Sequence, residues 1–252
     1  LIDLRHNGMI KVVTGMRRCG KSYLLFNLFT DALKAKGVDE ENIVQINLED
    51  RRNKSLRDPD KLLAYIDSRL KDNKMYYILL DEVQLVNEFE DVLNSYLQVK
   101  NADVYVTGSN ARFLSKDVIT EFRGRGLEIR VHPLSFSEIR GARPDEPIEQ
   151  LWIEYITYGG LPQVITMNSD QEKVDYLKGL FKHTYLKDIK ERYDIKLDGD
   201  LEELISTLAS TVGGLTNPRK LADTFRTVKK TTISQDTIKV YIDYLQDAFI
   251  IE

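Results

Sequence analysis

Apolar residues along the chain gather in short runs that alternate with amphipathic segments. Five runs have the length and composition of β-strands, at 9–15, 42–50, 76–84, 102–110 and 127–135. Three segments between them place apolar side chains at helical spacing, at 21–37, 58–72 and 87–100. The central runs are almost entirely apolar, which is typical of strands covered on both faces. The pattern predicts an α/β fold in which helices cover both faces of a mainly parallel sheet.

The second half of the chain is helical in pattern and lacks such runs. A segment with two prolines, a glycine and several charges, at 140–150, is the best candidate for a domain boundary. Beyond it, a helical pattern extends over 151–193 and is interrupted at the sequence YGGLPQ. Three further helices are predicted, at about 201–211, 218–228 and 234–251. We expect a core over 1–140, followed by helical regions over 150–195 and 200–252.

Composition and charge narrow the class of protein. The 252 residues are 42% hydrophobic and carry a formal net charge of −4, which excludes a basic surface over the whole molecule. No apolar run reaches the ~18–20 residues that span a bilayer, and no signal peptide is recognisable, so no membrane partner is expected. Cys19 is the only cysteine, which excludes an internal disulfide and favours a reducing cytoplasm. The three histidines are far apart in sequence and predict no metal site.

The run at 9–15 leads directly into TGMRRCGKS, which has the Gly-x-x-x-x-Gly-Lys-Ser spacing of a P-loop. In such a loop, backbone N–H groups surround phosphate oxygens, and the following helix adds the positive end of its dipole. We predict that Lys21 reaches the β- and γ-phosphates of a nucleotide and that the Ser22 hydroxyl ligates Mg²⁺. The residues predicted to contact nucleotide here are Gly15, Met16, Arg17, Arg18, Cys19, Gly20, Lys21, Ser22 and Tyr23. For Cys19, simple packing is favoured over a redox-sensitive role.

Two acids, Asp81 and Glu82, follow the apolar run YYILL. Asp81 suits Mg²⁺, directly or through water, and Glu82 suits the polarisation of an attacking water. Glu82 and Lys21 are therefore candidates for catalysis. The guanine-selecting sequence Asn-Lys-x-Asp is missing, since NKSL at 53–56 ends in leucine, and this favours ATP over GTP.

Polar residues also end two other strand-like runs. Thr107, Ser109 and Asn110 close the run VYVTGSN, where they would sense the γ-phosphate or hold the attacking water; capping of the next helix is the alternative. Ser109 and Asn110 join the catalytic candidates, although the sequence does not decide which of them senses phosphate. Asn47, in INLED, either holds Glu82 in an inactive pose or serves a turn at the strand end.

The order of these motifs resembles the AAA+ ATPases, specifically the bacterial and archaeal family in which a GxRRxGKS P-loop precedes an LLDEVQ Walker B strand. The runs VYVTGSNARFLS, FRGRGLEIRVHPLSFSE and YGGLP are similar to that family in order and spacing, and the resemblance covers nearly the whole chain. It implies an ASCE sheet, a helical lid over 150–195, and a winged-helix domain over 200–252 resembling that of origin-recognition ATPases and STAND switches.

The resemblance also implies roles for residues outside the P-loop. Gly160 and Pro162 match the GxP motif of a lid that closes over nucleotide, with a plain helix break as the alternative. Arg125 stands where an arginine finger would stand, with Arg123 as its rival. We expect Arg125 at the nucleotide edge of the sheet, too far round to reach its own γ-phosphate, so that it would act on a neighbouring copy in a homo-oligomer. A lid arginine of the sensor 2 type is not recognisable, which leaves the rate of hydrolysis open.

The last three predicted helices fit the helical half of a winged helix. Basic residues precede the last of these helices: Arg219, Lys220, Arg226, Lys229 and Lys230. The charges on that helix are mostly acidic, so DNA binding is less favoured than a winged helix with a protein-binding or purely structural role. The chain closes on the apolar run LQDAFIIE, and we expect the wing strands to be absent from residues 234–252.

We therefore predict a cytoplasmic ATPase of the AAA+ type that uses Mg²⁺ and ATP and couples nucleotide state to movement of the lid and winged helix. A slow ATP/ADP switch, an ATP-controlled DNA-binding regulator and, more weakly, a phosphotransferase remain alternatives.

Overall fold

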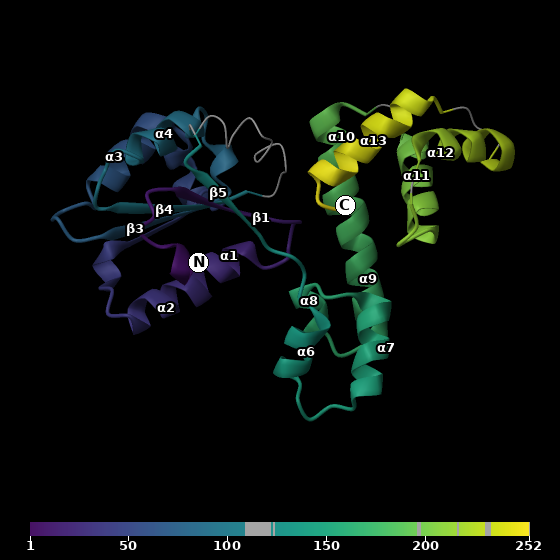
Figure 1. The fold of residues 1–252 in the computed structure, drawn as a ribbon, viewed down its shortest axis with the longest axis horizontal. Helices are drawn as coiled ribbons and strands as arrows, with labels where there is room; N and C mark the ends of the chain where they lie inside the picture. The colour runs from purple at the N-terminus through teal and green to yellow at the C-terminus, as the bar shows by residue number, and fades with distance from the viewer. Residues whose placement is uncertain (109–121, 123, 196–197, 216, 230–232, 252) are drawn as a thin grey trace. The chain divides into compact units, whose positions relative to one another are not determined.

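The computed structural model of the chain describes residues 1–108, 122, 124–195, 198–215, 217–229 and 233–251 (Figure 1). The chain divides into two compact units, Leu1–Met167 and Asn168–Glu252. The first part of the expected lid, up to Met167, therefore belongs to the same unit as the sheet. The three-part division expected from the sequence stays a prediction.

The first unit contains a five-stranded parallel sheet with the strand order β2-β3-β4-β1-β5. The strands are β1 (Ile10–Thr14), β2 (Ile43–Asn47), β3 (Tyr76–Asp81), β4 (Ala102–Thr107) and β5 (Gly126–Arg130). Each overlaps one of the five expected runs. Because β4 lies between β1 and β3, the sheet has the ASCE order, and the predicted fold class is confirmed.

The burial of the strands explains their apolar composition. Every residue of β1 and of β3 is buried, because both strands have neighbours on each side within the sheet and helices above and below it. At one face, Leu25, Phe29 and Leu33 pack against Tyr77 and Tyr105. The rings of Phe29 and Tyr105 have centroids 4.5 Å apart.

Helices cover both faces of the sheet, as the sequence predicts (Figure 1). A continuous helix follows the P-loop and consists of α1 (Lys21–Tyr23), a π-helical segment (Leu24–Phe29) and α2 (Thr30–Ala35). On the opposite face lie α3 (Pro59–Asp67) and α4 (Phe89–Tyr96). Short 3₁₀ turns occupy the connections, at Ile2–Leu4, Glu40–Asn42, Arg51–Arg57 and Val83–Leu85.

The first unit continues beyond β5 with three helices, α6 (Phe136–Ala142), α7 (Ile148–Tyr158) and α8 (Pro162–Ile165). Ser135 and Glu138 form a capping box at the start of α6. The proline-rich segment after it is a loop between α6 and α7. This loop is held by Arg143, which pairs with Glu146 and, at 3.0 Å, with Glu154.

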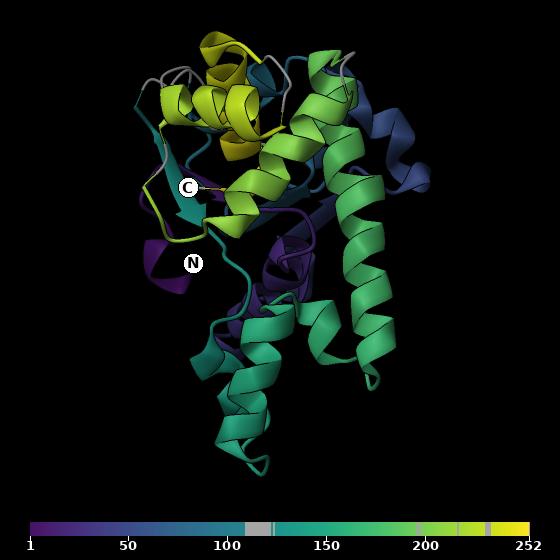
Figure 2. The same ribbon diagram turned by 90° about the vertical axis from the view of Figure 1, so that its right-hand side faces the viewer.

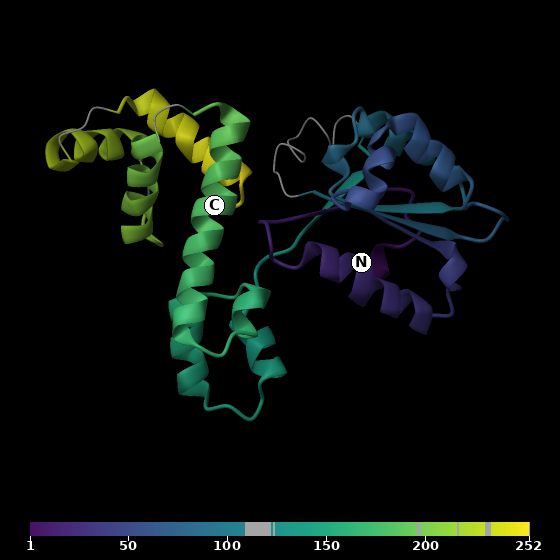
Figure 3. The ribbon, with the colours of Figure 1, turned by 180° about the vertical axis from the view of Figure 1, so that it is seen from behind.

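Helices are the only regular elements in the part of the second unit that the structure describes. Its longest helix consists of α9 (Asp170–Leu180), a π-helical segment (Phe181–Leu186) and α10 (Lys187–Tyr193), which Figures 2 and 3 show as one continuous rod. It is followed by α11 (Asp198–Ser210), α12 (Pro218–Thr224) with a π-helical extension (Phe225–Lys229), and α13 (Gln235–Asp247).

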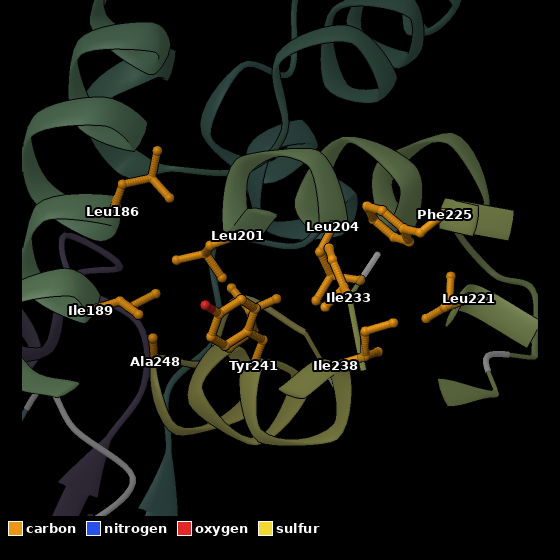
Figure 4. Close-up of a cluster of buried hydrophobic side chains, with 11 residues drawn as sticks. Leu186, Ile189, Leu201, Leu204, Leu221, Phe225, Ile233, Ile238, Tyr241 and Ala248 are labelled. Carbon is orange, nitrogen blue, oxygen red and sulfur yellow. The ribbon is translucent and has the colours of Figure 1, made fainter. Parts of the chain in front are cut away.

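Apolar side chains from the rod after α9 and from α11, α12 and α13 share one core (Figure 4). Its buried members are Leu186, Ile189, Leu201, Leu204, Leu221, Phe225, Ile233, Ile238, Tyr241, Leu245 and Ala248. The ring of Tyr193 also stacks on that of Tyr244 at 3.5 Å, and its hydroxyl donates to Asp247 at 2.6 Å. These contacts fasten α10 to α13.

The described residues 233–251 contain α13 and no strand. A wing is therefore absent from that stretch, and assignment of the second unit as a winged helix stays a prediction. None of the helices in the described parts of the chain combines the length and the apolar character needed to cross a membrane.

Candidate functional site

The P-loop connects the end of β1 to the start of α1 at the carboxyl edge of the sheet. Three of its residues have positive φ: Gly15 at 137°, Arg18 at 65° and Gly20 at 104°. At Gly15 a side chain is also excluded by space, because an added Cβ would collide with the carbonyl oxygen of Val131. Glycine is thus required at position 15 by both conformation and packing.

Lys21 lies at the first position of α1, and its side chain is folded back over the loop. Its ammonium donates hydrogen bonds to the carbonyl oxygens of Gly15 and Met16, each at 2.9 Å. The residue is only 5% exposed, so these bonds satisfy a cation that is largely removed from water. The loop therefore has its positive charge at its centre.

Other predicted P-loop contacts occupy different environments. Arg17 is half-buried, whereas Arg18 and Tyr23 are exposed. Cys19 is buried, and its thiol donates to the carbonyl oxygen of Val131 at 3.4 Å. Burial raises the pKa of the Cys19 thiol, although the Lys21 ammonium partly opposes this. A raised pKa lowers the fraction of reactive thiolate and supports the packing role of this side chain.

Asp81 ends β3 and receives hydrogen bonds from two other elements. Ser22 Oγ, in α1, and Thr107 Oγ1, at the end of β4, both donate to Asp81 Oδ1, at 2.9 Å and 2.5 Å. Asp81 is 2% exposed, and burial raises the pKa of its carboxyl while the two hydroxyl donors lower it. The adjacent positions of β3 and β4 bring Asp81 and Thr107 together.

Glu82 follows Asp81 in an unusual backbone conformation. Its φ and ψ are 55° and 49°, which lie in the left-handed region. A residue that has a Cβ adopts this backbone conformation only when its surroundings hold it there. Its backbone N–H donates to Thr107 Oγ1 at 3.0 Å. The side-chain amide of Gln84 donates from Nε2 to Glu82 Oε2. Thr107 thus connects the two acids, and Gln84 contacts the second of them.

The lid motif lies next to the P-loop. Pro162 Cγ would be 3.7 Å from a Cβ added at Gly20. Gly160 accepts a hydrogen bond from the backbone N–H of Leu134 at 2.7 Å, and a Cβ at Gly160 would collide with the Leu134 carbonyl oxygen. The predicted lid residues Gly160 and Pro162 are therefore positioned by close backbone contact with the segment after β5.

One expected position is corrected by the structure. Arg125 lies immediately before β5, and its carbonyl oxygen accepts from the backbone N–H of Ile10, the first residue of β1, at 2.8 Å. Arg125 is therefore at the amino edge of the parallel sheet, whereas the P-loop is at the carboxyl edge. The expectation that it lies at the nucleotide edge is wrong, because its loop leads into a strand instead of out of one.

Four further candidates have other outcomes. Asn47 pairs in register with Asp81, but its side-chain oxygen accepts from the backbone N–H groups of Glu49, at 2.8 Å, and Asp50, at 3.2 Å. This is the turn role that the sequence leaves as an alternative, and a hold on Glu82 by Asn47 remains untested. Ser109, Asn110 and Arg123 lie outside the described residues.

Comparison of the sequence with known protein families identifies the family to which this chain belongs. Residues 7–140 match the model of a protein family described as an AAA domain. The chain belongs to this AAA family. Residues 149–252 match a second family, described as a domain of unknown function.

The curated relatives that match this chain include proteins from two organisms. A Haemophilus influenzae relative, described as an uncharacterized protein, is 34% identical over 255 residues, which cover 99% of this chain and 63% of the relative. A Methanocaldococcus jannaschii relative, described in the same way, is 28% identical, with 96% and 55% covered. The chain thus spans between 55% and 63% of the length of these curated relatives.

Among solved structures, Aeropyrum pernix ORC1 in complex with DNA is similar to this chain, with a TM-score of 0.40 and 12% identity. The match covers 94% of this chain and 77% of that chain.

Three features of the AAA site were not predicted from sequence. The bridging position of Thr107 depends on strand order, which a local pattern does not contain. The backbone that closes on Gly15 is that of Val131, the residue after β5, which is more than 100 residues away along the chain. For Gln84 a signal was present, since a polar amide stands two positions after the acid that it contacts.

Proposed function

We propose that this protein binds ATP with Mg²⁺ at its P-loop and hydrolyses it. The observation that carries the proposal is the meeting of three elements at Asp81: the hydroxyls of Ser22 and Thr107 donate to it, and Thr107 also holds the backbone of Glu82. Groups suited to phosphate, to a divalent cation and to a water molecule are thereby gathered at the carboxyl edge of one sheet, where ligands of such sheets bind.

The chemistry of the donors fits Mg²⁺. Ser22 Oγ and Thr107 Oγ1 both lie within hydrogen-bond distance of Asp81 Oδ1, and Mg²⁺ prefers oxygen ligands such as these. Ser22 and Asp81 would hold the ion, with Thr107 fixing the orientation of the carboxylate. When bound, the ion would offset negative charge on the β- and γ-phosphates.

The P-loop residues supply phosphate binding. The Lys21 ammonium, which donates to the carbonyl oxygens of Gly15 and Met16, would exchange these partners for phosphate oxygens, which carry more negative charge. Positive φ at Gly15 and Gly20 turns the backbone so that N–H groups can face an anion. The missing guanine-selecting sequence supports ATP as the nucleotide.

Glu82 would act as the base for hydrolysis. The oxygen of a water molecule forms a bond to the γ-phosphorus while the bond from that phosphorus to the β–γ bridging oxygen breaks, and ADP leaves with the electron pair. Glu82 accepts one proton from the water and later returns it to solvent. The left-handed backbone at Glu82 and its bond to Thr107 direct the residue away from the line of β3.

The predicted lid residues, Gly160 and Pro162, would respond to whether nucleotide is bound at the P-loop. Pro162 lies against Gly20, so a ligand that changes the P-loop backbone also changes the packing surface of the segment that begins α8. We propose that this contact couples nucleotide state to movement of the helical regions.

Two variants test the proposal, with nucleotide affinity and phosphate release measured separately. Lys21→Ala should abolish detectable ATP binding, because it removes the cation that faces the β- and γ-phosphates. Glu82→Gln should bind ATP normally but turn over roughly 10²–10⁴-fold more slowly, the usual contribution of a positioned base. Glu88→Gln changes an exposed acid that has positive φ, as Glu82 has, and is the control that should behave as the parent. Normal ATP binding by Lys21→Ala would contradict the P-loop assignment.

Steady-state turnover also separates the ATPase from a slow nucleotide switch, which would bind ATP without appreciable phosphate release. DNA binding is a second candidate function, because Arg219 and Lys220 are exposed on the first turn of α12. A mobility-shift assay at two salt concentrations, with and without ATP, tests it: a phosphate-contacting surface loses affinity as salt rises.

A further inference from the structure

Gln84 lies in the 3₁₀ turn Val83–Leu85 that follows the Walker B acids. Its side-chain amide has two polar ends with different surroundings. Nε2 donates a hydrogen bond to Glu82 Oε2. Oε1 is buried and has no hydrogen-bond partner among the described residues. The polar contact that the structure gives this side chain is therefore the one to Glu82.

This combination is not what a purely structural glutamine would show. Buried polar atoms in proteins are nearly always paired, and one that is left unpaired lowers stability. A methionine of similar length would fill the same space without an unpaired oxygen. The glutamine thus carries a cost in stability, and groups that carry such a cost are concentrated at functional sites.

The contact has a clear physical effect on Glu82. A glutamate side chain has several rotamers of similar energy, and Glu82 is only partly buried, so packing alone does not select one of them. Hydrogen bonds in which the acceptor is ionised are stronger than those between neutral groups. The Gln84 amide therefore restricts the Glu82 carboxylate to one direction, while the bond from the Glu82 backbone to Thr107 fixes the start of the side chain.

We propose that Gln84 is a positioning residue for hydrolysis: its side-chain N–H holds the Glu82 carboxylate where it can take a proton from the attacking water. The inference rests on the proposed function, because it assigns a role in the same reaction. It concerns the direction of the carboxylate and adds no proton transfer of its own.

Gln84→Met is the decisive variant, since it keeps the volume and removes both polar ends. We expect kcat to fall roughly 10- to 100-fold, as for a small displacement of a catalytic group. The Kd for a fluorescent ATP analogue should stay within about twofold, because the hydrogen bond of Gln84 is to the proposed base, Glu82. The midpoint of urea unfolding should be unchanged or higher, because the unpaired buried oxygen is gone. Lower activity together with equal or greater stability is a result that a structural role would not produce.

A double-mutant cycle shows whether Gln84 acts through Glu82. If it does, Gln84→Met should lower kcat in the parent but have little further effect in a Glu82→Gln background. Gln84→Glu keeps the shape but replaces the donor by a second carboxylate, and should be at least as slow as Gln84→Met. Gln84→Asn keeps the amide on a shorter arm and should recover part of the activity. Leu85→Ala, at a half-exposed position of the same turn, is the matched control and should keep the parental kcat.

The outcomes distinguish the inference from the function on which it rests. A parent that binds ATP but releases no phosphate would overturn the ATPase proposal. A parent that hydrolyses ATP and is impaired by Glu82→Gln, but not by Gln84→Met, would overturn the positioning role alone. Equal losses from Gln84→Met in the parent and in the Glu82→Gln background would also overturn it, because the effect would not pass through Glu82.

Discussion

Lys11 and Asp103 form an ion pair inside the sheet, with side chains that are 0% and 4% exposed. Asp103 also accepts from the Tyr105 hydroxyl at 2.9 Å and from the backbone N–H of His6 at 3.1 Å. The Lys11 ammonium lies 5.1 Å from the centroid of the Tyr105 ring. Both charged residues are near the amino ends of their strands, so this cluster is at the opposite edge from the P-loop.

The pair should matter for stability and not for nucleotide affinity. Lys11→Met leaves the Asp103 carboxylate buried without its cation, and losing one partner of a buried pair costs roughly 3–5 kcal/mol. Urea unfolding should report this loss. ATP affinity, measured where the variant is fully folded, should match the parent.

The surface pair Lys34–Glu40 provides the control. Its side chains are 41% and 83% exposed at a separation of 3.2 Å, so water already stabilises both charges. Lys34→Met should therefore change the free energy of unfolding by less than about 1 kcal/mol. Equal effects of the two substitutions would contradict the argument from burial.

Gly15 and Gly37 allow the steric requirement of the P-loop to be measured. Both have positive φ, 137° and 83°, but a Cβ at Gly37 meets nothing within 4 Å, whereas at Gly15 it meets the Val131 carbonyl. Gly37→Ala should cost only backbone strain, roughly 1–2 kcal/mol, and leave ATP affinity unchanged. Gly15→Ala should cost more and weaken ATP binding at least about tenfold, a change of ~1.4 kcal/mol.

The two glycine variants are compared by urea unfolding and by ATP titration. Displacement of Val131 in Gly15→Ala also disturbs its N–H bond to Thr14, at 2.7 Å, and its contact with the Cys19 thiol. If Gly15→Ala bound ATP with parental affinity, the close contact with Val131 would have no importance for the site.

Short segments of the sequence are enough to predict much of this fold. The run YYILL predicts β3 because a strand covered on both faces must be apolar throughout, and the acids after it mark the carboxyl edge. The P-loop is recognisable for the same reason: glycine is required where φ is positive and space is short, as at Gly15. In both cases one short segment contains all the physical information.

The rest depends on contacts between distant segments. Thr107 donates its hydrogen bond to Asp81 because β4 lies beside β3 in the sheet. The periodicity of helices and strands in the sequence does not reveal this strand order. Sequence position alone places Arg125 at the wrong edge, because a loop that enters a parallel strand lies at the amino edge of the sheet and a loop that leaves one lies at the carboxyl edge. The domain boundary expected at 140–150 is a loop between α6 and α7, where Arg143 pairs with Glu146 and Glu154.

Tyr105 should make the fold sensitive to alkaline pH. Burial and the adjacent Asp103 raise the pKa of its hydroxyl above the ordinary value. A tyrosine whose pKa is raised by folding contributes stability that is present below the unfolded pKa of about 10 and is lost as pH rises above it. The free energy of unfolding should fall by about 1.4 kcal/mol per pH unit there from this residue alone.

Tyr105→Phe isolates that contribution. Near pH 8 the variant should be less stable than the parent, because Asp103 loses a hydrogen bond. Above about pH 10 the difference in the free energy of unfolding between parent and variant should shrink. Only the parent has this hydroxyl, and its folded state must keep it protonated at a pH where the unfolded state releases the proton. Tyr23→Phe, at a ring that is 61% exposed, is the control. A difference for Tyr105→Phe that stays constant from pH 8 to 11 would contradict the prediction.

Arg125 leads to a prediction about assembly. It is exposed, follows Gly124 with φ of 74°, and is anchored through its carbonyl to Ile10 at the amino edge of the sheet. From that edge its side chain does not reach a nucleotide in the P-loop of the same sheet, because the five residues of β1 separate the two ends by roughly 16 Å. We propose that it acts on ATP held by a neighbouring copy, where a guanidinium matches the charge of the phosphoryl oxygens.

Subunit mixing tests this. Arg125→Ala should bind ATP normally but turn it over poorly, since arginine fingers contribute roughly 10³–10⁵ in rate. Lys21→Ala should be inactive because it binds no ATP, yet it still carries Arg125. In a mixture, a subunit with an intact P-loop can meet a neighbour with an intact arginine, so activity should return. The specific activity of the parent should also rise with protein concentration as neighbours associate. A mixture that stays inactive, together with parental activity that is independent of concentration, would show that Arg125 does not act between subunits.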